Sequence, residues 1–581
     1  MATEELLTEQ FQFLGIEVQK EVLCKCVSLC KEYDVDAETL VELWMAFSLT
    51  NLNGAPPNLD TLNSLERKEF SKRADRLSAP VKDARSSTGI SFTAYRASAA
   101  SQPDNEVLSE YMSTTPKRVK EESDSVSIHE TKIDPGINSP KIGVSSKYSS
   151  RTNAGSVLHS YGEDKLLQVI AKHNGPNNDL KLNVTQVPND DGDLYTKAVF
   201  GFELLHEKAS VYDNHISYIS RCILKKAGIT ETSSVRHKTQ VDVAVAGRIQ
   251  CDADARLNSK SVVLQGTWEQ SLSQTVPVDL DNLKQYSLFP GQVVVMRGFN
   301  PRGDKFIAQE VFCDGSLPLP DHSADKTNVL EGTMSMVIVA GPYTTSDNLL
   351  YEPLKDLVSY ITTHKPHVVI MTGPFVDSDH PKIKDNSLTE TYKSLFDRLM
   401  DSLAEIHTSS PYTKLYIVSS SKDAFHLNIY PTSAYSSRRK LPHVQFMPDP
   451  CTLNINGIIV GITSTDVLMQ ISQEEISLGA GGDKLARLAG HVLAQQCYSP
   501  LWPPLAQPVD AALWAAHAQL PRTPHLLVLP SNFRYFVKEV NGSIVVNPER
   551  LTKGTGGGTF ARLLVNVDAG TRNVAAQIMR I

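Results

Sequence analysis

The chain has 581 residues, of which 41% are hydrophobic and 21% are charged. This composition is ordinary for a soluble protein, but the length exceeds what one hydrophobic core supports, so we expect several domains. The net charge of -8 and the pI of about 6.1 exclude a protein whose whole surface coats nucleic acid, although local basic patches remain open.

The sequence shows no signal for secretion or membrane insertion. Its first ten residues, MATEELLTEQ, are acidic, and no stretch approaches 18 consecutive apolar residues. The eight cysteines form no CxxC pair, so we expect reduced thiols rather than a disulfide framework. Among the clustered Cys24, Cys26 and Cys30, the last two share a helical stripe with Val22 and Leu29. This pattern favours buried packing over a zinc site.

Residues 1–75 are predicted to form a small helical domain. Four apolar residues recur at the i, i+3, i+4, i+7 spacing that places side chains on one helix face: Leu40, Leu43, Trp44 and Phe47. A bundle of this size is typical of a docking module. A bundle that only adds stability is the alternative, because periodicity does not show what a surface contacts.

Residues 76–155 are rich in Ser, Thr, Lys, Asp and Pro and are predicted to be a disordered linker. Thr115 and Ser139 each precede a proline and are candidate phosphorylation sites. A short basic run is typical of segments that nuclear import receptors bind, and it consists of Lys117, Arg118 and Lys120. We therefore expect a nuclear phosphoprotein, with an unmodified, solvated linker as the alternative.

The middle of the chain is predicted to hold a helical connecting segment, residues 156–234, followed by a small barrel, residues 235–325. The connecting segment could belong to either neighbouring domain. Five strand-like runs separated by turn-rich segments predict an OB-fold: VDVAVAGRI, SVVLQG, TVPVDL, GQVVVMRGF and KFIAQEVF.

The predicted barrel carries side chains of the types that bind single-stranded DNA by stacking and charge. They are Trp268, Phe299, Arg248, Arg297, Arg302 and Lys305. Scattered aromatics and arginines are as often packing and rim residues, and many OB-folds bind proteins instead. A single-strand DNA binder is therefore one hypothesis for the barrel, not its necessary function.

Residues 326–581 alternate between strand and helix patterns and predict one α/β domain. The strands MSMVIVAGPY and HVVIMTGPFVD are followed by the helices NLLYEPLKDLVSYITTH and SLTETYKSLFDRLMDSLAEIH. Further apolar strands then follow: KLYIVSSSKD, GIIVGITSTD, PHLLVLPSNF and SIVVNPERL. Open α/β sheets build their sites in the loops at the carboxyl ends of such strands.

The order of these parts, and three strings in particular, make the chain resemble the B subunits of DNA polymerase alpha, which are accessory subunits of the polymerase–primase assembly. The strings are VAGPYTTSDN, MTGPFVD and LPSNFRYFVKEVNGSIVVNPERLTKGTGGGTFARL. The resemblance implies a multidomain α+β protein with an N-terminal helical bundle, a disordered linker, a five-stranded OB β-barrel and an α/β calcineurin-like phosphoesterase domain.

The resemblance also implies a degenerate phosphoesterase site. Active calcineurin-like enzymes clamp two metal ions with Asp-x-His, Gly-Asp-x-x-Asp, Gly-Asn-His and Gly-His-x-His motifs at strand ends. The residues of this chain in those loops include Pro342, Pro374, Asp377, Lys422, Asp423 and Arg534. Of the motif ligands only Asp377 is retained, and two cations are added. We therefore expect a catalytically inactive domain with no metal and no other cofactor.

This domain has two further candidate sites: a different metal site and a phosphate-binding loop. Asp377, Asp379 and His380, together with His426 or His525, would make a different metal site, and an active metal-dependent phosphodiesterase or nuclease would depend on one. The glycine run KGTGGGT lacks the GxxxxGK[ST] order of a phosphate-binding loop. We interpret it as a tight backbone turn.

The resemblance further implies partners. A non-catalytic scaffold of this family grips the C-terminal zinc-binding domain of the catalytic polymerase subunit. It meets the primase subunits through the complex and recruits other replication factors through the N-terminal domain. Direct DNA binding would be weak, and no membrane is involved. The rival functions are an active phosphodiesterase and an OB-fold single-strand DNA binder.

Overall fold

The computed structural model describes most of the chain beyond residue 144. The described ranges are 20–32, 145–172, 182–187, 199–320, 332–386, 388–437, 443–505, 507–568 and 571–581, with the single positions 40, 41, 44, 57, 62 and 441. The chain divides into two compact units, Met1–Ala100 and Ser101–Ile581. The candidate phosphorylation sites Thr115 and Ser139 lie outside the described residues, as does the basic run of Lys117, Arg118 and Lys120.

The first unit contains helix α2 (Lys20–Glu32). Cys26 and Leu29 are fully buried on it, and Val22 and Cys30 are nearly so. This confirms the predicted apolar packing of these thiols. Further buried residues of the unit are Leu40, Val41, Trp44 and Leu62, of which the first and third belong to the predicted helix stripe. Leu43 and Phe47 lie outside the described residues.

The second unit contains a closed five-stranded barrel, as the sequence predicts. Its strands, in barrel order, are β3 (Thr239–Cys251), β4 (Val262–Gln265), β5 (Thr275–Asp279), β8 (Phe306–Phe312) and β7 (Val293–Asn300). Alternate residues such as Val245, Val294 and Phe306 fill the interior. The 23-residue helix α9 (Leu205–Ala227) covers the outside, packing Ile216 and Ile219 against the barrel wall.

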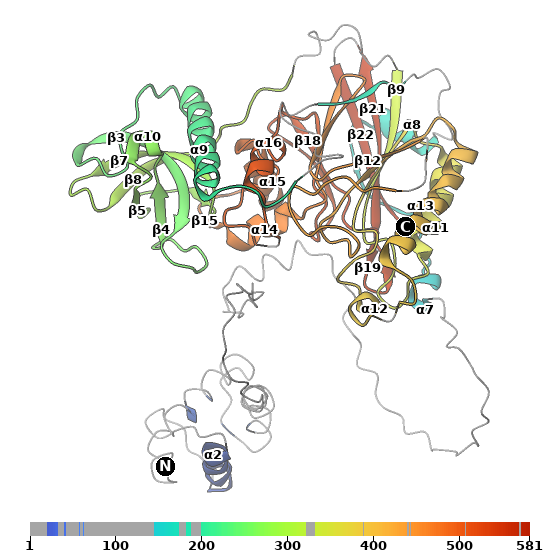
Figure 1. Cartoon of the computed structure of the whole chain (residues 1–581), viewed down its shortest axis with the longest axis horizontal. Helices are drawn as coiled ribbons and strands as arrows, with labels where there is room; N and C mark the ends of the chain where they lie inside the picture. The colour runs from blue at the N-terminus through green and yellow to red at the C-terminus, as the bar shows by residue number, and fades with distance from the viewer. Residues whose placement is uncertain are drawn as a thin grey trace. The chain divides into compact units, whose positions relative to one another are not determined.

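A two-sheet domain contains most of the other described residues of the second unit (Figure 1). The seven-stranded sheet runs β1 (Val157–Tyr161), β22 (Thr571–Arg580), β21 (Thr559–Asp568), β9 (Gly332–Ala340), β10 (Val368–Thr372), β11 (Lys414–Val418), β12 (Val444–Met447). The six-stranded sheet runs β17 (Phe536–Val540), β18 (Ser543–Asn547), β16 (Leu526–Val528), β14 (Ile458–Ile462), β13 (Cys451–Ile455), β2 (Val184–Gln186). We call these strands and the helices on them the two-sheet domain.

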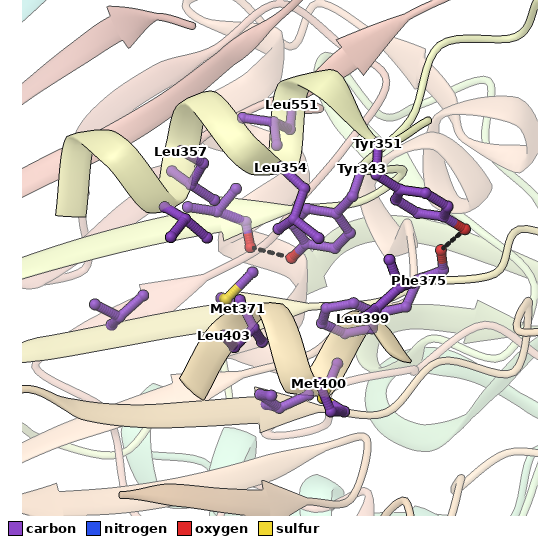
Figure 2. Packing of buried hydrophobic residues seen from close by; sticks show 14 of the residues in the cluster. Tyr343, Tyr351, Leu354, Leu357, Met371, Phe375, Leu399, Met400, Leu403 and Leu551 are labelled. Carbon is purple, nitrogen blue, oxygen red and sulfur yellow. Dashed lines mark hydrogen bonds between the residues drawn. The ribbon is translucent and has the colours of Figure 1, made fainter. Parts of the chain in front are cut away.

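The two sheets pack face to face between layers of helices. On β9, Met336 and Ile338 point into the core between the sheets, whereas Val337 and Val339 point to the opposite face. This burial on both faces explains why the strands are continuous apolar runs. Helices α11 (Glu352–His364) and α13 (Tyr392–Ser409) cover the outer face of the seven-stranded sheet, and α14 (Val467–Glu474) and α15 (Lys484–Ala494) cover that of the six-stranded sheet. Figure 2 shows the packing under α11 and α13.

The expectation of a helical connecting segment at 156–234 is wrong for part of its length. Strand β1 pairs with β22 in one sheet, and β2 pairs with β13 in the other, whereas α8 (Asp164–Lys172) packs on β22. These edge strands are short and carry no period-2 pattern, so tertiary pairing rather than local propensity orders them. The barrel is therefore inserted between strands of the two-sheet domain.

The predicted linker also ends earlier than residue 155. The short helix α7 (Ser146–Ser149) packs on the two-sheet domain, and the side chain of its Tyr148 is only 2% exposed. One large aromatic anchor orders this segment despite its polar composition, because burying a tyrosine ring offsets the conformational entropy of a few residues.

The barrel and the two-sheet domain share a hydrogen-bonded joint. Strand β6 (Tyr286–Leu288), beside the barrel, pairs with β15 (Ile476–Leu478). The buried Gln495 amide accepts from the Val293 N–H at 2.7 Å and donates to the Val293 carbonyl at 3.0 Å. Gln495 thus satisfies a barrel strand as a neighbouring strand would.

Helix α9 belongs to this joint as well. Its Tyr212 ring lies 4.1 Å from that of Trp502 and 5.6 Å from that of Trp514, on helix α16 (Ala511–His517). Glu203, just before α9, accepts from the Ala511 and Ala512 N–H groups.

No helix among the described residues combines the length and the apolar character that crossing a bilayer requires.

Candidate functional site

The loops after β9, β10 and β11 begin side by side. The three strands are parallel and in register, so Ala340, Thr372 and Val418 end them at one level. Gly341 N–H donates to the Thr372 carbonyl at 2.9 Å, and Gly373 N–H donates to the Val418 carbonyl at 3.0 Å. Since ligands of open α/β sheets bind at this edge, these loops are the candidate site.

The first two loops are pressed directly against each other. A side chain at Gly341 would lie 2.1 Å from the Pro374 carbonyl oxygen, and one at Gly373 would lie 2.6 Å from the Tyr435 hydroxyl. Both positions need glycine because the surrounding atoms approach so closely. The space between these strand ends is therefore occupied by protein atoms.

Aromatic side chains fill the space beneath these loops. Tyr343, fully buried, stacks on Phe375 with ring centroids 4.5 Å apart and donates its hydroxyl to the Thr372 carbonyl at 2.9 Å. Tyr351 donates to the Phe375 carbonyl at 2.9 Å, as Figure 2 shows. Burial raises the pKa of Tyr343 well above its usual value, so its hydroxyl stays protonated and can donate.

The Asp423 carboxyl group binds the main chain of the second loop, which follows β10. Its Oδ1 accepts from the Phe375 N–H at 2.8 Å and the Val376 N–H at 2.6 Å, and its Oδ2 accepts from the Tyr435 hydroxyl. Burial raises the pKa of Asp423 to about 7. A carboxyl group with both oxygens engaged, in a site that disfavours its charge, is poorly suited to bind a cation.

The remaining residues of the predicted site differ in their surroundings. Asp377 faces Asp423 in an isolated β-bridge, and burial raises the pKa of Asp377 as well. Pro342 and Pro374 lie in the two touching loops. The side chains of Lys422 and Arg534 are exposed, and Arg534 stacks on its neighbour Tyr535. The structure therefore gathers the two prolines and two aspartates, whereas the two cations extend into solvent.

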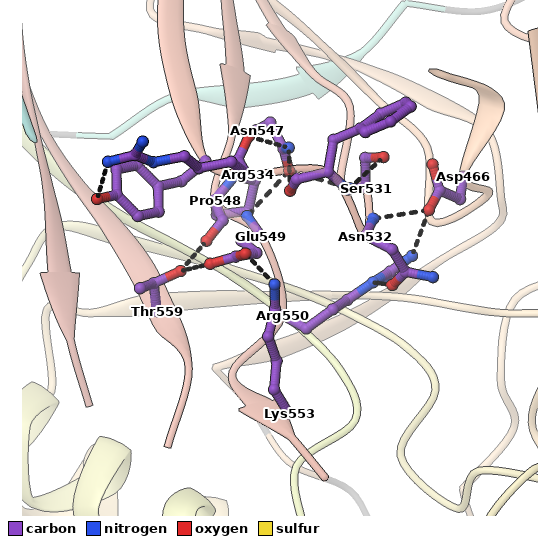
Figure 3. Close-up of polar contacts among 12 residues, drawn as sticks. Asp466, Ser531, Asn532, Arg534, Asn547, Pro548, Glu549, Arg550, Lys553 and Thr559 are labelled. Carbon is purple, nitrogen blue, oxygen red and sulfur yellow. Dashed lines mark hydrogen bonds and ion pairs between the residues drawn. The ribbon is translucent and has the colours of Figure 1, made fainter. Parts of the chain in front are cut away.

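The buried cation among these strand-end loops is Arg550, which the sequence analysis did not identify. The Arg550 side chain is 8% exposed; its Nε donates to Asn532 Oδ1 at 3.1 Å, and its terminal nitrogens lie 3.5 Å from Asp466 Oδ2 and from the Gly341 carbonyl. Asn532 N–H donates to the same Asp466 oxygen at 2.7 Å (Figure 3). One guanidinium thus joins loops from both sheets.

The adjacent carboxylate, that of Glu549, also binds other groups of the protein. Glu549, 1% exposed, pairs with Lys553 and accepts from the Thr559 hydroxyl at 3.1 Å (Figure 3). Asn547 Oδ1 accepts from the N–H groups of Ser531 and Glu549, each at 2.9 Å. The motif that contains Arg550, NPERL, was visible in the sequence, but nothing in one sequence marks which arginine is buried.

The donor set does not fit a pair of divalent ions. Within the part of the chain that the structure describes, no three His, Cys, Asp or Glu side chains gather as metal ligands would. The carboxylates of Asp423, Asp466 and Glu549 already accept from N–H or O–H groups or pair with basic side chains. A metal pair would have to displace these internal partners.

The alternative metal site also fails to assemble. His380 Nε2 contacts the Thr345 carbonyl at 2.9 Å while its Nδ1 accepts from the Lys382 N–H, and Asp379 pairs with Lys384 at 2.8 Å. The other two histidines bind backbone groups: His426 binds the Ser433 carbonyl, and His525 binds the Ile459 N–H. These imidazoles bind main-chain groups, and among the residues that the structure describes they belong to no cluster of three candidate metal ligands.

The glycine run forms a turn, as interpreted from its sequence. Strands β19 (Thr552–Lys553) and β20 (Gly556–Gly557) pair antiparallel around it, and Gly554 has a positive φ of 55°. The Thr552 hydroxyl donates to the Pro342 carbonyl at 2.8 Å, so this hairpin packs on the first loop.

The barrel residues proposed to bind single-stranded DNA do not share one environment. Trp268 is 64% exposed, on helix α10 (Trp268–Ser271), and Phe299 is half-buried. Arg248 is buried, bonded to Gln265 and placed over the Tyr212 ring. Arg297 pairs with Glu310 and Lys305 with Asp279, whereas Arg302 is exposed. Three of these four cations are thus engaged with other protein groups.

Comparison with known proteins shows which family the chain resembles along its length. Three family models match successive parts of the chain. They describe the N-terminal part of the DNA polymerase alpha B subunit, matched at residues 5–72, the OB domain of the same B subunit, matched at 209–314, and the B subunit of DNA polymerases alpha and epsilon, matched at 336–538. The models follow the order of helical unit, barrel and two-sheet domain.

Curated relatives match along the whole chain. The DNA polymerase alpha B subunit of Mus musculus is 34% identical, and the match covers 99% of both chains. The B subunit of Drosophila melanogaster is 31% identical over 100% of both, and that of Schizosaccharomyces pombe is 30% identical over 70% of this chain and 75% of its own. A match of this extent goes beyond one shared domain. The chain belongs to the family of DNA polymerase alpha B subunits.

Proposed function

We propose that this protein is a non-catalytic scaffold in the polymerase alpha–primase complex, in the nucleus, where it supports the initiation of DNA replication. The observation that carries the proposal is the closed edge of the two-sheet domain, where the Arg550 guanidinium bonds to Asn532 and Asp466 among loops from several strand ends. A domain whose site is filled by its own side chains is suited to contact rather than to hydrolysis.

The proposed partner is the C-terminal zinc-binding domain of the catalytic polymerase subunit, with the primase subunits joined through the complex. Family membership supports this assignment. The barrel and the two-sheet domain offer a suitable platform, because Gln495, the β6–β15 pairing and α9 fix one to the other. A preorganised surface loses little entropy on binding.

The N-terminal region has a different proposed role. We assign residues 1–75 to docking of other replication factors and residues 76–144 to a tether that carries Thr115 and Ser139. Phosphorylation of these residues would add nearly two negative charges each and alter recruitment. The basic run of Lys117, Arg118 and Lys120 is the proposed import signal.

Co-purification tests the scaffold role directly. The full chain, tagged in cells, should recover the catalytic polymerase and primase subunits, and so should a chain that lacks residues 1–144. The shorter chain should lose the additional replication factors. A full chain that recovers no polymerase or primase subunit would refute the proposal.

Metal and hydrolysis assays test the absence of catalysis. The purified full chain should contain less than one manganese ion per molecule after dialysis against manganese, and it should hydrolyse no phosphodiester. Turnover that is lost in Asp377→Ala but kept in Asp379→Ala would contradict the proposal, because Asp377 is the one retained motif ligand.

A further inference from the structure

The segment that leads into the two-sheet domain lies in a seat of its own. Its residues Ser145–Arg151, here called the strap, contact α11, strand β20 and the end of β22, which are separated from the strap by 200 residues or more of sequence. Tyr148 at its centre is 2% exposed and packs with Ile581 in the core beneath α11.

Polar contacts fix the strap at both ends and at its centre. Ser145 N–H lies 3.4 Å from Glu352 Oε2, and its hydroxyl lies 3.4 Å from the Thr555 carbonyl. The Tyr148 hydroxyl donates to Asp356 Oδ2 at 2.8 Å. Burial raises the pKa of Tyr148, so the hydroxyl remains a donor.

Arg151 closes the strap over its own tyrosine. Its Nε donates to the Ile581 carbonyl at 3.0 Å, a terminal nitrogen donates to the Tyr148 carbonyl at 2.9 Å, and another pairs with Asp356. The guanidinium carbon lies 3.7 Å from the centre of the Tyr148 ring. Tyrosine and arginine therefore bind the same carboxylate, which makes Asp356 the centre of recognition.

The seat is shaped for this tyrosine. A side chain at Gly557 would lie 3.2 Å from Tyr148 Cε2 and 3.1 Å from the Ile581 carbonyl, so glycine leaves room for the ring. Acidic groups of α11 face the strap, whose Lys147 side chain is exposed and takes no part in these contacts. The seat thus combines an apolar slot with carboxylates that match a cation.

We propose that this seat is a peptide-binding site, occupied in cis by the strap, that accepts a segment with a tyrosine three residues before an arginine. Occupation by the strap fixes the point at which the tether leaves the folded body. The β19–β20 hairpin connects this point to the strand-end loops: Ser145 contacts the Thr555 carbonyl on one side of the hairpin, and the Thr552 hydroxyl bonds to the Pro342 carbonyl on the other. The inference is independent of which polymerase subunit the domain holds.

Hydrogen exchange of the full chain tests occupation without any substitution at the seat. The Ser149 N–H donates to the Ser145 carbonyl at 3.0 Å and the Ile581 N–H donates to the Gly558 carbonyl at 3.2 Å, so both amides report on the strap and its seat. We expect Tyr148→Ala to speed exchange at Ser149 by about tenfold or more, whereas Lys147→Ala leaves it unchanged. Exchange at the rate of an unstructured chain in the unmodified protein would overturn the proposal.

A peptide added in trans tests recognition. The probe is a labelled synthetic peptide of residues 143–153, added to the full chain carrying Tyr148→Ala and Arg151→Ala, with circular dichroism to confirm that the chain remains folded. We expect saturable binding of the peptide to this doubly substituted chain. Binding to the unmodified chain, whose seat is filled by its own strap, should be about tenfold weaker, and so should binding to the doubly substituted chain that also carries Asp356→Ala. Equal binding by a peptide with Tyr148→Ala, or no binding to the vacated seat, would refute the proposal.

Gly557→Ala provides a second route that leaves the strap sequence intact. The added methyl group narrows the slot, so the strap of this variant should exchange faster while the unlinked Gly490→Ala, which has space around it, should not. Unchanged protection of Ser149 in Gly557→Ala would contradict the assigned role of the slot.

Discussion

Arg550 and Asp466 form an ion pair at 3.5 Å in which both side chains are about nine-tenths buried. Asp466 also caps helix α14 by accepting from the Met469 N–H at 3.1 Å, so the pair links a strand-end loop to a helix of the second sheet. A cation supplied by the chain itself therefore lies among the loops that follow the strand ends of both sheets.

Replacing this cation should destabilise the two-sheet domain. Arg550→Met leaves the buried Asp466 carboxylate without its charged partner, and we expect a loss of about 3 kcal/mol in the free energy of unfolding, measured by urea denaturation. The exposed Arg534→Met is the matched control and should change it by less than about 0.5 kcal/mol. Equal effects of the two substitutions would show that the pair is not structural.

The buried carboxyl group of Asp423 should make stability depend on pH near neutrality. Its pKa is raised from 3.8 to about 7, so the fold favours the protonated form and loses stability as the pH rises through this window. Asp423→Asn cannot ionise and keeps an acceptor for the Phe375 and Val376 N–H groups. We expect the unmodified chain to lose roughly 2 to 3 kcal/mol relative to the variant between pH 5 and pH 8.

Thermal unfolding of both chains across this range measures the effect. Asp379→Asn is the control, because a hydrogen bond from Lys384 lowers the pKa of Asp379 and the carboxylate is exposed. If the two variants follow the same pH profile, the proposed environment of Asp423 is wrong.

The joint between barrel and two-sheet domain should depend on Gln495. Gln495→Ala leaves the buried N–H and carbonyl groups of Val293 without these partners, which costs about 2 to 4 kcal/mol when neither group reaches water. We expect the barrel to separate from the two-sheet domain at a lower denaturant concentration in Gln495→Ala than in the unmodified chain. Limited proteolysis at increasing denaturant concentration measures this separation. Gln519→Ala, whose amide reaches Cys497 Sγ at 3.8 Å, is the control and should leave the digestion pattern unchanged.

Acid should weaken the same joint through Glu475. This buried carboxylate accepts from Ser287 beside the barrel, pairs with Arg487 at 2.8 Å and lies 3.2 Å from His491 Nε2. Although burial alone would raise it, hydrogen bonds from His491, Arg487 and Ser287 lower the pKa of Glu475 to about 2. The stabilisation is therefore complete above pH 4.5 and is lost as the pH falls from 4.5 to 2.

Glu475→Gln should remove this acid dependence, and acid titration followed by tryptophan fluorescence measures it. The adjacent Glu474→Gln is the control, since burial raises the pKa of Glu474 and the expected trend has the opposite sign. An equal loss of stability between about pH 5 and about pH 2.5 in the unmodified chain and in Glu475→Gln would contradict the prediction.

Periodic apolar patterns made much of the fold predictable. The five barrel strands lie where alternation placed them, and α11 and α13 form because Leu354, Leu357 and Ile361, or Leu395, Leu399 and Leu403, recur on one face. The edge strands β1 and β2 and the strap have no such pattern. Their order depends on pairing with β22, on pairing with β13 and on the Tyr148 slot, and these partners are distant in sequence.

The candidate site was predictable in its location but not in its interior. The family resemblance points to Pro342, Pro374, Asp377 and Asp423, and parallel strands deliver the loops that contain them to one edge. The burial of Arg550 and the solvent exposure of Lys422 and Arg534 depend on how loops from two sheets meet. Charge and spacing along one sequence do not specify that meeting.

The pairing of Tyr161 with Ala576 has a consequence for biosynthesis. The two partners are separated by about 400 residues, and at the usual pace of translation the second emerges roughly 20 to 80 seconds after the first. Until then β1 lacks its partner strand in the sheet, while the barrel, which lies between them in the sequence, can already close because its strands are near in sequence. The nascent chain therefore carries an incomplete sheet while its barrel is complete, and the unpaired backbone groups of β1 remain exposed to association with other chains during that interval.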